Sequence, residues 1–174
     1  KSSMKFGDSS IVGRVMYQAV RASGWFRGSA EVYVAMLIPR GDTLKNEFAH
    51  RYDIYEGPEE DVLTRYHQAM LEYDADYVVR LTGDCAWMQS KVISKGLRDC
   101  LKYESDYCSN VLIRTFMEGL DVEVLSKRAL GILNEVAKSN FDREHVTTYL
   151  LNNLAMNRDH GLRIHTVLNE YDLS

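Results

Sequence analysis

Two carboxylates, Asp121 and Glu123, stand two positions apart in a segment where they alternate with Leu120, Val122 and Val124. Residues two apart in a strand share one face, so the carboxylates are expected to point one way and the apolar side chains the other. A pair of carboxylates on one strand face suits a metal ion or the hydroxyl groups of a sugar. An edge strand with one solvated face would carry the same pattern, so both interpretations are open.

Arg80 and Thr82 share a face of another short apolar segment, residues 76–82. An arginine within an apolar strand needs a partner. Arg80 is therefore expected either to form an ion pair with an acid such as Glu60 or Asp61, or to face a phosphate group. The sequence alone favours neither interpretation over the other.

The elements that position these residues alternate along the chain. Strands are predicted over residues 31–38, 52–55, 76–82, 106–112, 120–125 and 162–167, and helices over 11–23, 43–50, 59–73, 89–103, 127–138 and 142–152. This alternation predicts an α/β fold, in which a mostly parallel mixed sheet has helices on both faces. Ligands of such sheets bind at the carboxyl ends of strands, which selects residues 82–85 and 110–119.

Composition limits the class of protein. The 174 residues carry a net charge of −4, with 45% hydrophobic and 26% charged residues, which is typical of a globular chain, and a single domain over residues 1–174 is expected. The acidic balance argues against nucleic-acid binding and an acidic membrane surface but allows a local basic pocket. No membrane span or signal peptide is evident. Cys85, Cys100 and Cys108 form no CxxC pair, so a reduced, soluble, cytoplasmic protein is expected.

Five ordered blocks of this sequence carry a family resemblance. They are EGPEEDVLTRY at 56–66, VRLTGDC at 79–85, DYCSN at 106–110, RTF with GLDVEV at 114–116 and 119–124, and REHVT at 143–147. Over roughly residues 8–160 the chain resembles the cytidylyltransferase group typified by spore-coat polysaccharide biosynthesis protein F, which is related to the CMP-sialic-acid and CMP-Kdo synthetases. The resemblance implies a nucleotide-diphospho-sugar-transferase fold, a Rossmann-like α/β/α sandwich. It also implies Mg²⁺-dependent transfer of CMP from CTP to a hydroxyl of an acidic sugar, with release of pyrophosphate.

The same resemblance implies roles for individual residues. Asp84 would bind Mg²⁺ and the nucleotide phosphates, and Gly83 would let a phosphate approach the backbone. An aspartate that only caps the next segment is the alternative. The predicted catalytic residues are Asp84, Lys5 and Arg80, and the predicted nucleotide-binding residues are Ser2, Ser3, Lys5, Thr82 and Gly83.

Acceptor binding is predicted for a further group, because a sugar acid needs a cationic or amide partner. Its members are Asn110, Arg114, Thr115, Asp121, Glu123, Arg143 and His145. His145 could donate a hydrogen bond or act as a general base, or it could be a structural residue near a helix start. Cys85 is expected to be a small packing residue rather than a nucleophile. The expected partners are CTP and a small acidic sugar, with homodimer formation through residues 110–124 left open.

Three positions depart from the family pattern. Residues 1–7 lack the proline and final lysine of the donor loop R-x-x-S-x-R-[LF]-P-x-K and the strand that precedes it, so a first strand is expected upstream of Lys1. Ala86 replaces the proline of Gly-Asp-Cys-Pro. Leu168 replaces a second metal-binding aspartate, whose role Asn169 or Glu170 would have to take.

These departures leave two alternative functions. One is a catalytically degenerate relative that binds a nucleotide or sugar and serves as a partner subunit. The other is a glycosyltransferase that uses a nucleotide sugar on the same scaffold. One architecture supports many chemistries, so the predicted fold does not separate them.

Overall fold

The structure, a computed structural model, describes residues 4–6, 9–153 and 160–174. Its strands are β1 (Lys5–Phe6), β2 (Ser9–Ser10), β3 (Ala35–Pro39), β4 (Asp53–Gly57), β5 (Tyr77–Arg80), β6 (Tyr107–Ser109), β7 (Glu123–Ser126) and β8 (Ile164–Thr166). Its helices are α1 (Ile11–Ser23), the 3₁₀ helix η1 (Gly24–Phe26), α2 (Leu44–Phe48), α3 (Val62–Glu72), α4 (Ser90–Lys102), α5 (Lys127–Val136), α6 (Asn140–His145) and α7 (Thr148–Asn152). The predicted alternation of strands and helices is confirmed.

The chain forms two compact units. Unit 1 comprises the described parts of Lys1–Val34, Val79–Val124 and Ile164–Ser174, and unit 2 those of Ala35–Val78 and Leu125–Arg163. Among the described residues, no helix is both long enough and apolar enough to cross a membrane. The expectation of a single domain over residues 1–174, with a first strand upstream of Lys1, stays a prediction.

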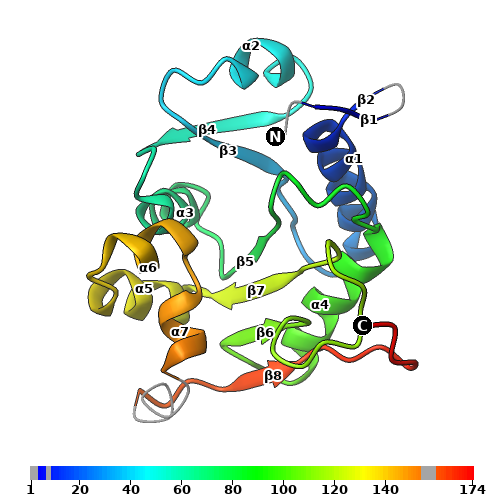
Figure 1. Cartoon of the computed structure of the whole chain (residues 1–174), viewed down its shortest axis with the longest axis vertical. Coiled ribbons are helices and arrows are strands. Elements are labelled where there is room, and N and C mark those ends of the chain that lie inside the picture. The colour runs from blue at the N-terminus through cyan, green and yellow to red at the C-terminus, as the bar shows by residue number, and fades with distance from the viewer. Residues whose placement is uncertain (1–3, 7–8, 154–159) are drawn as a thin grey trace. The chain divides into compact units, whose positions relative to one another are not determined.

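Helices α1 and α4 lie next to each other in unit 1 (Figure 1). As predicted, α1 begins after Ser10, whose hydroxyl accepts a hydrogen bond from the Gly13 amide at 3.2 Å, and ends before Gly24. The Ser90 amide at the start of α4 donates to Gln18 Oε1 of α1 at 3.0 Å. This hydrogen bond fixes the position of the first turn of α4 along the axis of α1.

Strands β5, β7, β6 and β8 form one sheet in that order. Strand β7 is therefore an interior strand, and the predicted alternative of an edge strand with one solvated face is wrong. Strands β6 and β8 are parallel, with Cys108 opposite His165. Val122, just before β7, and Val124 are only 1% and 0% exposed, because their side chains pack against Gly96 of α4.

Gly96 of α4 allows close packing against Val122. A Cβ atom at Gly96 would lie 2.9 Å from Val122 Cγ1, closer than two carbon atoms can pack, and the buried valine cannot move aside. We expect Gly96→Ala to lower the free energy of unfolding by about 1–3 kcal/mol. The matched change Gly131→Ala in α5, where nothing lies within 4 Å, should raise it by about 0.5–1 kcal/mol. Urea unfolding of both variants tests this pair, and a Gly96→Ala protein as stable as the parent would contradict the packing described.

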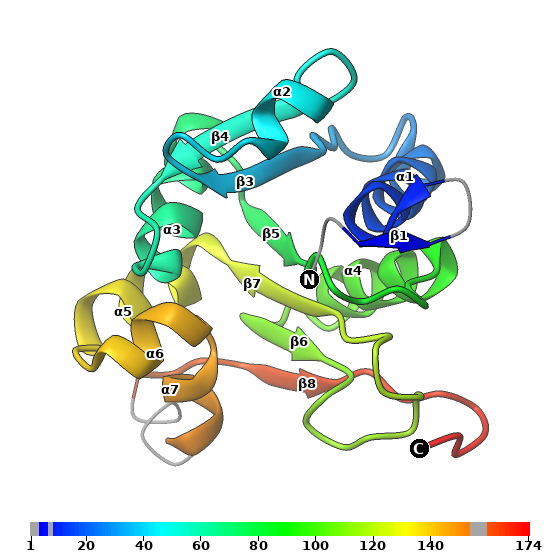
Figure 2. The same ribbon diagram turned by 45° about the horizontal axis from the view of Figure 1, so that its top comes forward.

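Unit 2 contains a parallel pair of strands and a group of helices. Strands β3 and β4 pair in parallel, with Met36 opposite Ile54 (Figure 2). Helix α3 contacts both α5 and α6. Within residues 4–6, 9–153 and 160–174, β3 pairs only with β4, so the predicted sheet is divided into separate sheets.

One predicted helix, residues 142–152, is divided into α6 and α7 by Val146. Its φ of 64° and ψ of −59° are strained for a β-branched residue. The Thr147 amide donates to the His145 carbonyl at 2.7 Å, which closes a tight turn around Val146. The Val146 side chain is 0% exposed, and this burial offsets the strained backbone. The hydrophobic pattern of the sequence carries no sign of this turn.

Candidate functional site

The chain turns at the carboxyl end of β5 before α4 begins. Gly83 and Asp84 form the turn, in which the Cys85 amide donates to the Thr82 carbonyl at 3.3 Å and the Ala86 amide to the Asp84 carbonyl at 2.9 Å. The Thr82 hydroxyl and the Cys85 thiol are 3.0 Å apart. Thr82, Gly83 and Asp84 therefore lie at the carboxyl end of β5, where the sequence predicts a ligand site. Hydrogen bonds of the backbone hold this turn in place.

The Asp84 carboxylate is exposed, and no other described residue forms a hydrogen bond or ion pair with it. It does not cap α4, whose N-cap residue is Gln89. An exposed carboxylate without a protein partner keeps all its lone pairs available to a cation or a hydroxyl group. Within the part of the chain that the structure describes, the turn thus presents an unpaired acid to solvent.

Arg80, Glu123 and Tyr107 connect the neighbouring strands β5, β7 and β6. Arg80 Nη1 forms an ion pair with Glu123 Oε2, and the Tyr107 hydroxyl donates to Glu123 Oε1 at 2.6 Å. Glu123 is 5% exposed and Tyr107 0% exposed. Burial, followed by the negative charge of Glu123, raises the pKa of Tyr107 well above its usual value, so its hydroxyl remains a donor.

This arrangement gives Arg80 the partner that an arginine in an apolar strand needs, and its contact with a phosphate group stays a prediction. The ion pair is formed, but its acid is Glu123 rather than Glu60 or Asp61. Because both Glu123 oxygens are engaged inside the protein, Glu123 positions Arg80 and is not open to an acceptor sugar. The sequence did not indicate Tyr107. One feature of the sequence could have indicated Tyr107 as a partner of a buried acid. It is a tyrosine in a predicted strand, and a buried tyrosine hydroxyl needs a hydrogen-bond partner.

Asp121 lies in the loop before β7 and pairs with Arg114. Arg114 donates to the two Asp121 oxygens at 2.9 and 3.3 Å, and this hydrogen bonding raises the pKa of Arg114. Burial raises the pKa of the Cys85 thiol, and the charges of Asp121 and Asp84 raise it further. The two carboxylates therefore lie near the same thiol. Cys85 is 7% exposed, which agrees with the predicted packing role.

Two other predicted acceptor residues make contacts within unit 1. Asn110 is 2% exposed, its amide group donates to the Leu120 carbonyl at 2.8 Å, and its Oδ1 accepts from the Val122 amide at 2.8 Å. Asn110 thus holds the loop before β7 and is not open to a sugar. The Thr115 hydroxyl accepts from the Asn169 amide at 2.8 Å, so Thr115 fixes the segment after β8.

The remaining positions of unit 1 are at its surface. Lys5 is exposed on β1, and the predicted nucleotide-binding residues Ser2 and Ser3 lie outside the described residues. Leu168 is 47% exposed, and Asn169 Oδ1 accepts from the Glu170 amide at 3.1 Å. The Glu170 side chain is exposed. Asn169 and Glu170 both stay candidates for the second metal ligand, a role that Leu168 cannot have.

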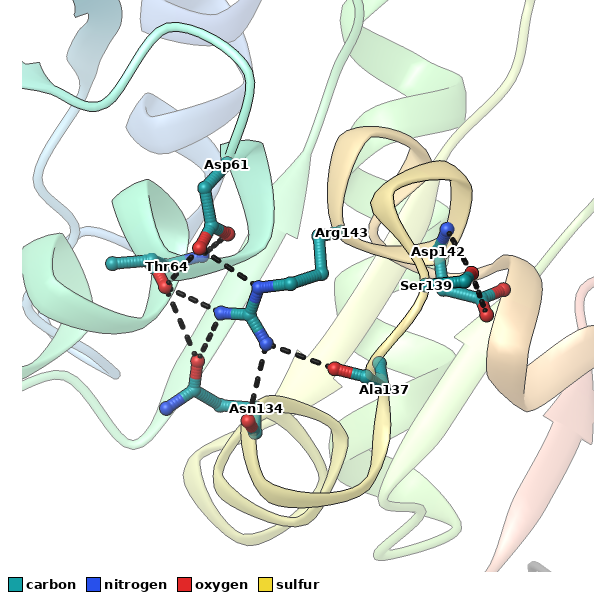
Figure 3. Close-up of polar contacts among 7 residues, drawn as sticks. All are labelled: Asp61, Thr64, Asn134, Ala137, Ser139, Asp142 and Arg143. Atoms are coloured by element: carbon teal, nitrogen blue, oxygen red, sulfur yellow. Dashed lines mark hydrogen bonds and ion pairs between the residues drawn. The ribbon is translucent and has the colours of Figure 1, made fainter.

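Arg143 and His145 belong to unit 2. Figure 3 shows Arg143 surrounded by acceptors: Asp61 Oδ2 at 2.8 Å, Asn134 Oδ1 at 2.9 Å, the Ala137 carbonyl at 3.0 Å and the Thr64 hydroxyl. These contacts join α6 to α3 and α5. Among the described residues, Arg143 therefore has a structural role. His145 is exposed and meets the Phe141 ring edge-on, with the ring centroids 4.4 Å apart.

The Arg143 contacts predict a pH dependence of stability. Burial alone would raise the pKa of Asp61, but hydrogen bonds from Arg143 and Thr64 outweigh it and lower the pKa below its ordinary value of 3.8. In the acid range the unfolded chain then binds more protons at Asp61 than the folded chain, so stability is lost as the pH falls through the lowered pKa. Asp61→Asn should therefore flatten the dependence of unfolding free energy on pH below about 4. Urea unfolding at several pH values tests this, with exposed Asp53→Asn as the control; equal slopes for Asp61→Asn and the parent would refute it.

Comparison with known proteins identifies the family. A model of the cytidylyltransferase family matches residues 1–170. The chain belongs to the cytidylyltransferase family. An uncharacterized protein of Methanocaldococcus jannaschii is 30% identical to this chain over 152 residues, which cover 86% of this chain. The chain spans about 60% of the length of that relative.

Solved structures show the fold of this chain. A cytidylyltransferase from Leptospira borgpetersenii is 24% identical with a TM-score of 0.82, and the match covers 100% of this chain and 71% of that one. A CMP:2-keto-3-deoxy-manno-octonic acid synthetase complexed with CTP has 11% identity, a TM-score of 0.63 and coverages of 97% and 83%. Rv0371c of Mycobacterium tuberculosis, in complex with manganese, has 9% identity, a TM-score of 0.62 and coverages of 97% and 80%. The predicted family and its Rossmann-like α/β/α fold are confirmed.

The acidic side chains of the described residues fit one kind of metal site. Among the described residues, no three His, Cys, Asp or Glu side chains are grouped to hold a metal ion. Mg²⁺ is usually held by one or two carboxylates together with substrate phosphates and water. The exposed, unengaged Asp84 carboxylate fits such a shared site, and a closed cage of protein ligands does not fit.

Proposed function

We propose that this protein transfers the cytidylyl group of CTP to a hydroxyl group of a small acidic sugar, with Mg²⁺ and with release of pyrophosphate. The observation that carries the proposal is the state of the three acids near β5 and β7. Glu123 is engaged by Arg80 and Tyr107, and Asp121 by Arg114, whereas Asp84 has no described partner. The acid left open is the one at the carboxyl end of β5, where ligands of parallel sheets bind.

The residues around Asp84 have separate tasks in this proposal. Asp84 would hold Mg²⁺, and Gly83 would let the phosphates approach the backbone. When bound, Mg²⁺ would supply positive charge that lowers the repulsion between the triphosphate and the incoming oxygen. Arg80, held by Glu123 at the same strand end, is the residue we assign to donate hydrogen bonds to a phosphate oxygen.

The transfer itself needs two substrates held in line. The sugar hydroxyl gives its proton to solvent water and its oxygen bonds to the α-phosphorus, while the bond from that phosphorus to the oxygen bridging to the β-phosphate breaks and pyrophosphate leaves. Holding both substrates in this geometry removes much of the entropic barrier. Arg114 is the cation we assign to the sugar carboxylate, because its side chain is 43% exposed and its guanidinium can bind a carboxylate with two hydrogen bonds, as it does with Asp121, which the sugar would displace.

Other properties support the proposal without deciding it. One structural neighbour is a synthetase complexed with CTP, and another holds manganese. The cysteines Cys85, Cys100 and Cys108 are free and buried, which agrees with the cytoplasm, the compartment we propose. Homodimer formation through residues 110–124 stays a prediction.

Pyrophosphate release tests the function. The protein is incubated with CTP, Mg²⁺ and a panel of sugar acids, with the matching neutral sugars and with UTP and ATP as controls. We expect release that requires CTP, Mg²⁺ and an acid. Thermal stabilisation by CTP without any release would favour a binding-only partner subunit. Cleavage of a nucleotide sugar without use of CTP would favour a glycosyltransferase.

A further inference from the structure

Unit 1 has a hollow that the proposed reaction does not use. It has a volume of about 780 Å³ and is lined by Trp25 of η1 and by Lys91, Lys95, Arg98, Asp99 and Lys102 of α4. Helix α4 can be followed in Figure 2. We name these six residues the α4 groove. A hollow of this size is within the range of ligand sites.

The α4 groove is strongly positive although the chain has a net charge of −4. Its only acid, Asp99, pairs with Lys95 at 2.8 Å. Lys91, Arg98 and Lys102 form no ion pair with any described residue. Three like charges without a counter-charge in one hollow attract an anion and repel one another in its absence.

The four cations follow one line along α4. They stand at i, i+4, i+7 and i+11, and a helical rise of about 1.5 Å per residue spaces them by about 6, 4.5 and 6 Å. A linear ligand with a negative group on each successive unit can meet such a row. A compact ligand with a single charge would leave most of the row unused.

Trp25 supplies a flat surface beside this row. It is 53% exposed, and the Arg98 guanidinium carbon lies 5.2 Å from its ring centroid, which fixes the ring by a cation–π contact. The aliphatic stems of the lysines add further apolar wall. The protein thus offers an aromatic ring and apolar lysine stems between its cations. This combination suits a ligand made of rings that have apolar faces and carry negatively charged groups.

We propose that the α4 groove binds an acidic oligosaccharide, a chain of sugar rings that carry carboxylate or phosphate groups. A sugar ring packs its C–H face on Trp25, and its anionic groups pair with the row of cations. Single-stranded nucleic acid is less well matched, because the hollow offers one aromatic platform and not a series. An anionic membrane is less well matched, because the aromatic ring lines a hollow and a membrane needs an apolar face that enters the lipid.

Fluorescence anisotropy with labelled oligogalacturonate, which has a carboxylate on every sugar, tests the proposal. We expect binding that weakens with salt and is absent for a neutral maltooligosaccharide of the same length. Lys91→Glu/Arg98→Glu should weaken it about tenfold or more, and Trp25→Ala should weaken it several-fold. The control Arg51→Glu/Lys138→Glu makes the same change of charge at exposed residues of unit 2 and should have little effect.

Several results would overturn the proposal. Oligogalacturonate could fail to bind, or it could bind the Lys91→Glu/Arg98→Glu protein as tightly as the parent. Oligothymidylate, polyglutamate or vesicles of anionic lipid could bind more tightly through the same residues, and the groove would then have another occupant. Lys102→Glu provides a second variant if the double variant is not folded by circular dichroism. The test does not involve CTP, so its outcome is independent of the proposed transfer reaction.

Discussion

Asp84→Asn is expected to reduce CTP-dependent pyrophosphate release about a thousandfold or more while the protein stays folded. Asparagine keeps the shape of the side chain but removes the negative charge that would hold Mg²⁺ against the phosphates. The Asp84 side chain is exposed and has no partner among the described residues, so its loss should change the free energy of unfolding by less than about 0.5 kcal/mol. Steady-state kinetics over a range of Mg²⁺ concentrations, together with urea unfolding, measure both effects.

A matched control accompanies this variant. Glu135 is an exposed acid on α5 in unit 2, and Glu135→Gln removes the same charge. It should leave both release and stability unchanged. If Asp84→Asn retained the turnover of Glu135→Gln, Asp84 would have no part in the mechanism.

Glu123→Gln should be the most destabilising single change near the site. The change would remove the carboxylate that forms an ion pair with Arg80, whose side chain is only 16% exposed. Removing one partner of a buried ion pair costs about 3–5 kcal/mol. Urea unfolding measures this cost, and release kinetics should show a parallel loss of turnover because Arg80 is no longer held at the end of β5.

Tyr107→Phe separates the hydrogen bond from the charge. This variant removes the 2.6 Å bond to Glu123 and keeps the ion pair with Arg80, so it should cost about 1–2 kcal/mol. Replacing both Arg80 and Glu123 by methionine should recover part of the stability lost in Glu123→Gln, since no buried charge is then left unpaired. Equal stability of Glu123→Gln and the parent would show that the pair does not hold these strands together.

The sequence predicts most of the local structure. The Ser10 cap and Gly24 mark the two ends of α1, and the turn at Gly83-Asp84 ends β5, because caps, glycines and apolar periodicity act between residues that are close in the chain. The break at Val146 was not predictable in this way. Its strained backbone depends on burial of the side chain, which a local pattern does not contain.

The turn that carries Asp84 was predictable from the sequence, but the partners of the neighbouring residues were not. Asp84 was named by the family resemblance and Arg114 by the need of a sugar acid for a cation, and their roles stay predictions. The partner of Arg80 is 43 residues away, and its identity depends on which strand lies beside β5. Asn110 has the residue type of a sugar ligand, but its burial and its two bonds to the loop before β7 make it structural.

Binding of Mn²⁺, followed by electron paramagnetic resonance in place of Mg²⁺, tests the central claim most directly. In the presence of CTP, the parent protein should bind about one Mn²⁺ ion per chain, and Asp84→Asn should lose most of that affinity while Glu135→Gln retains it. Equal CTP-dependent affinity for Mn²⁺ in Asp84→Asn and the parent would show that the cation is held elsewhere.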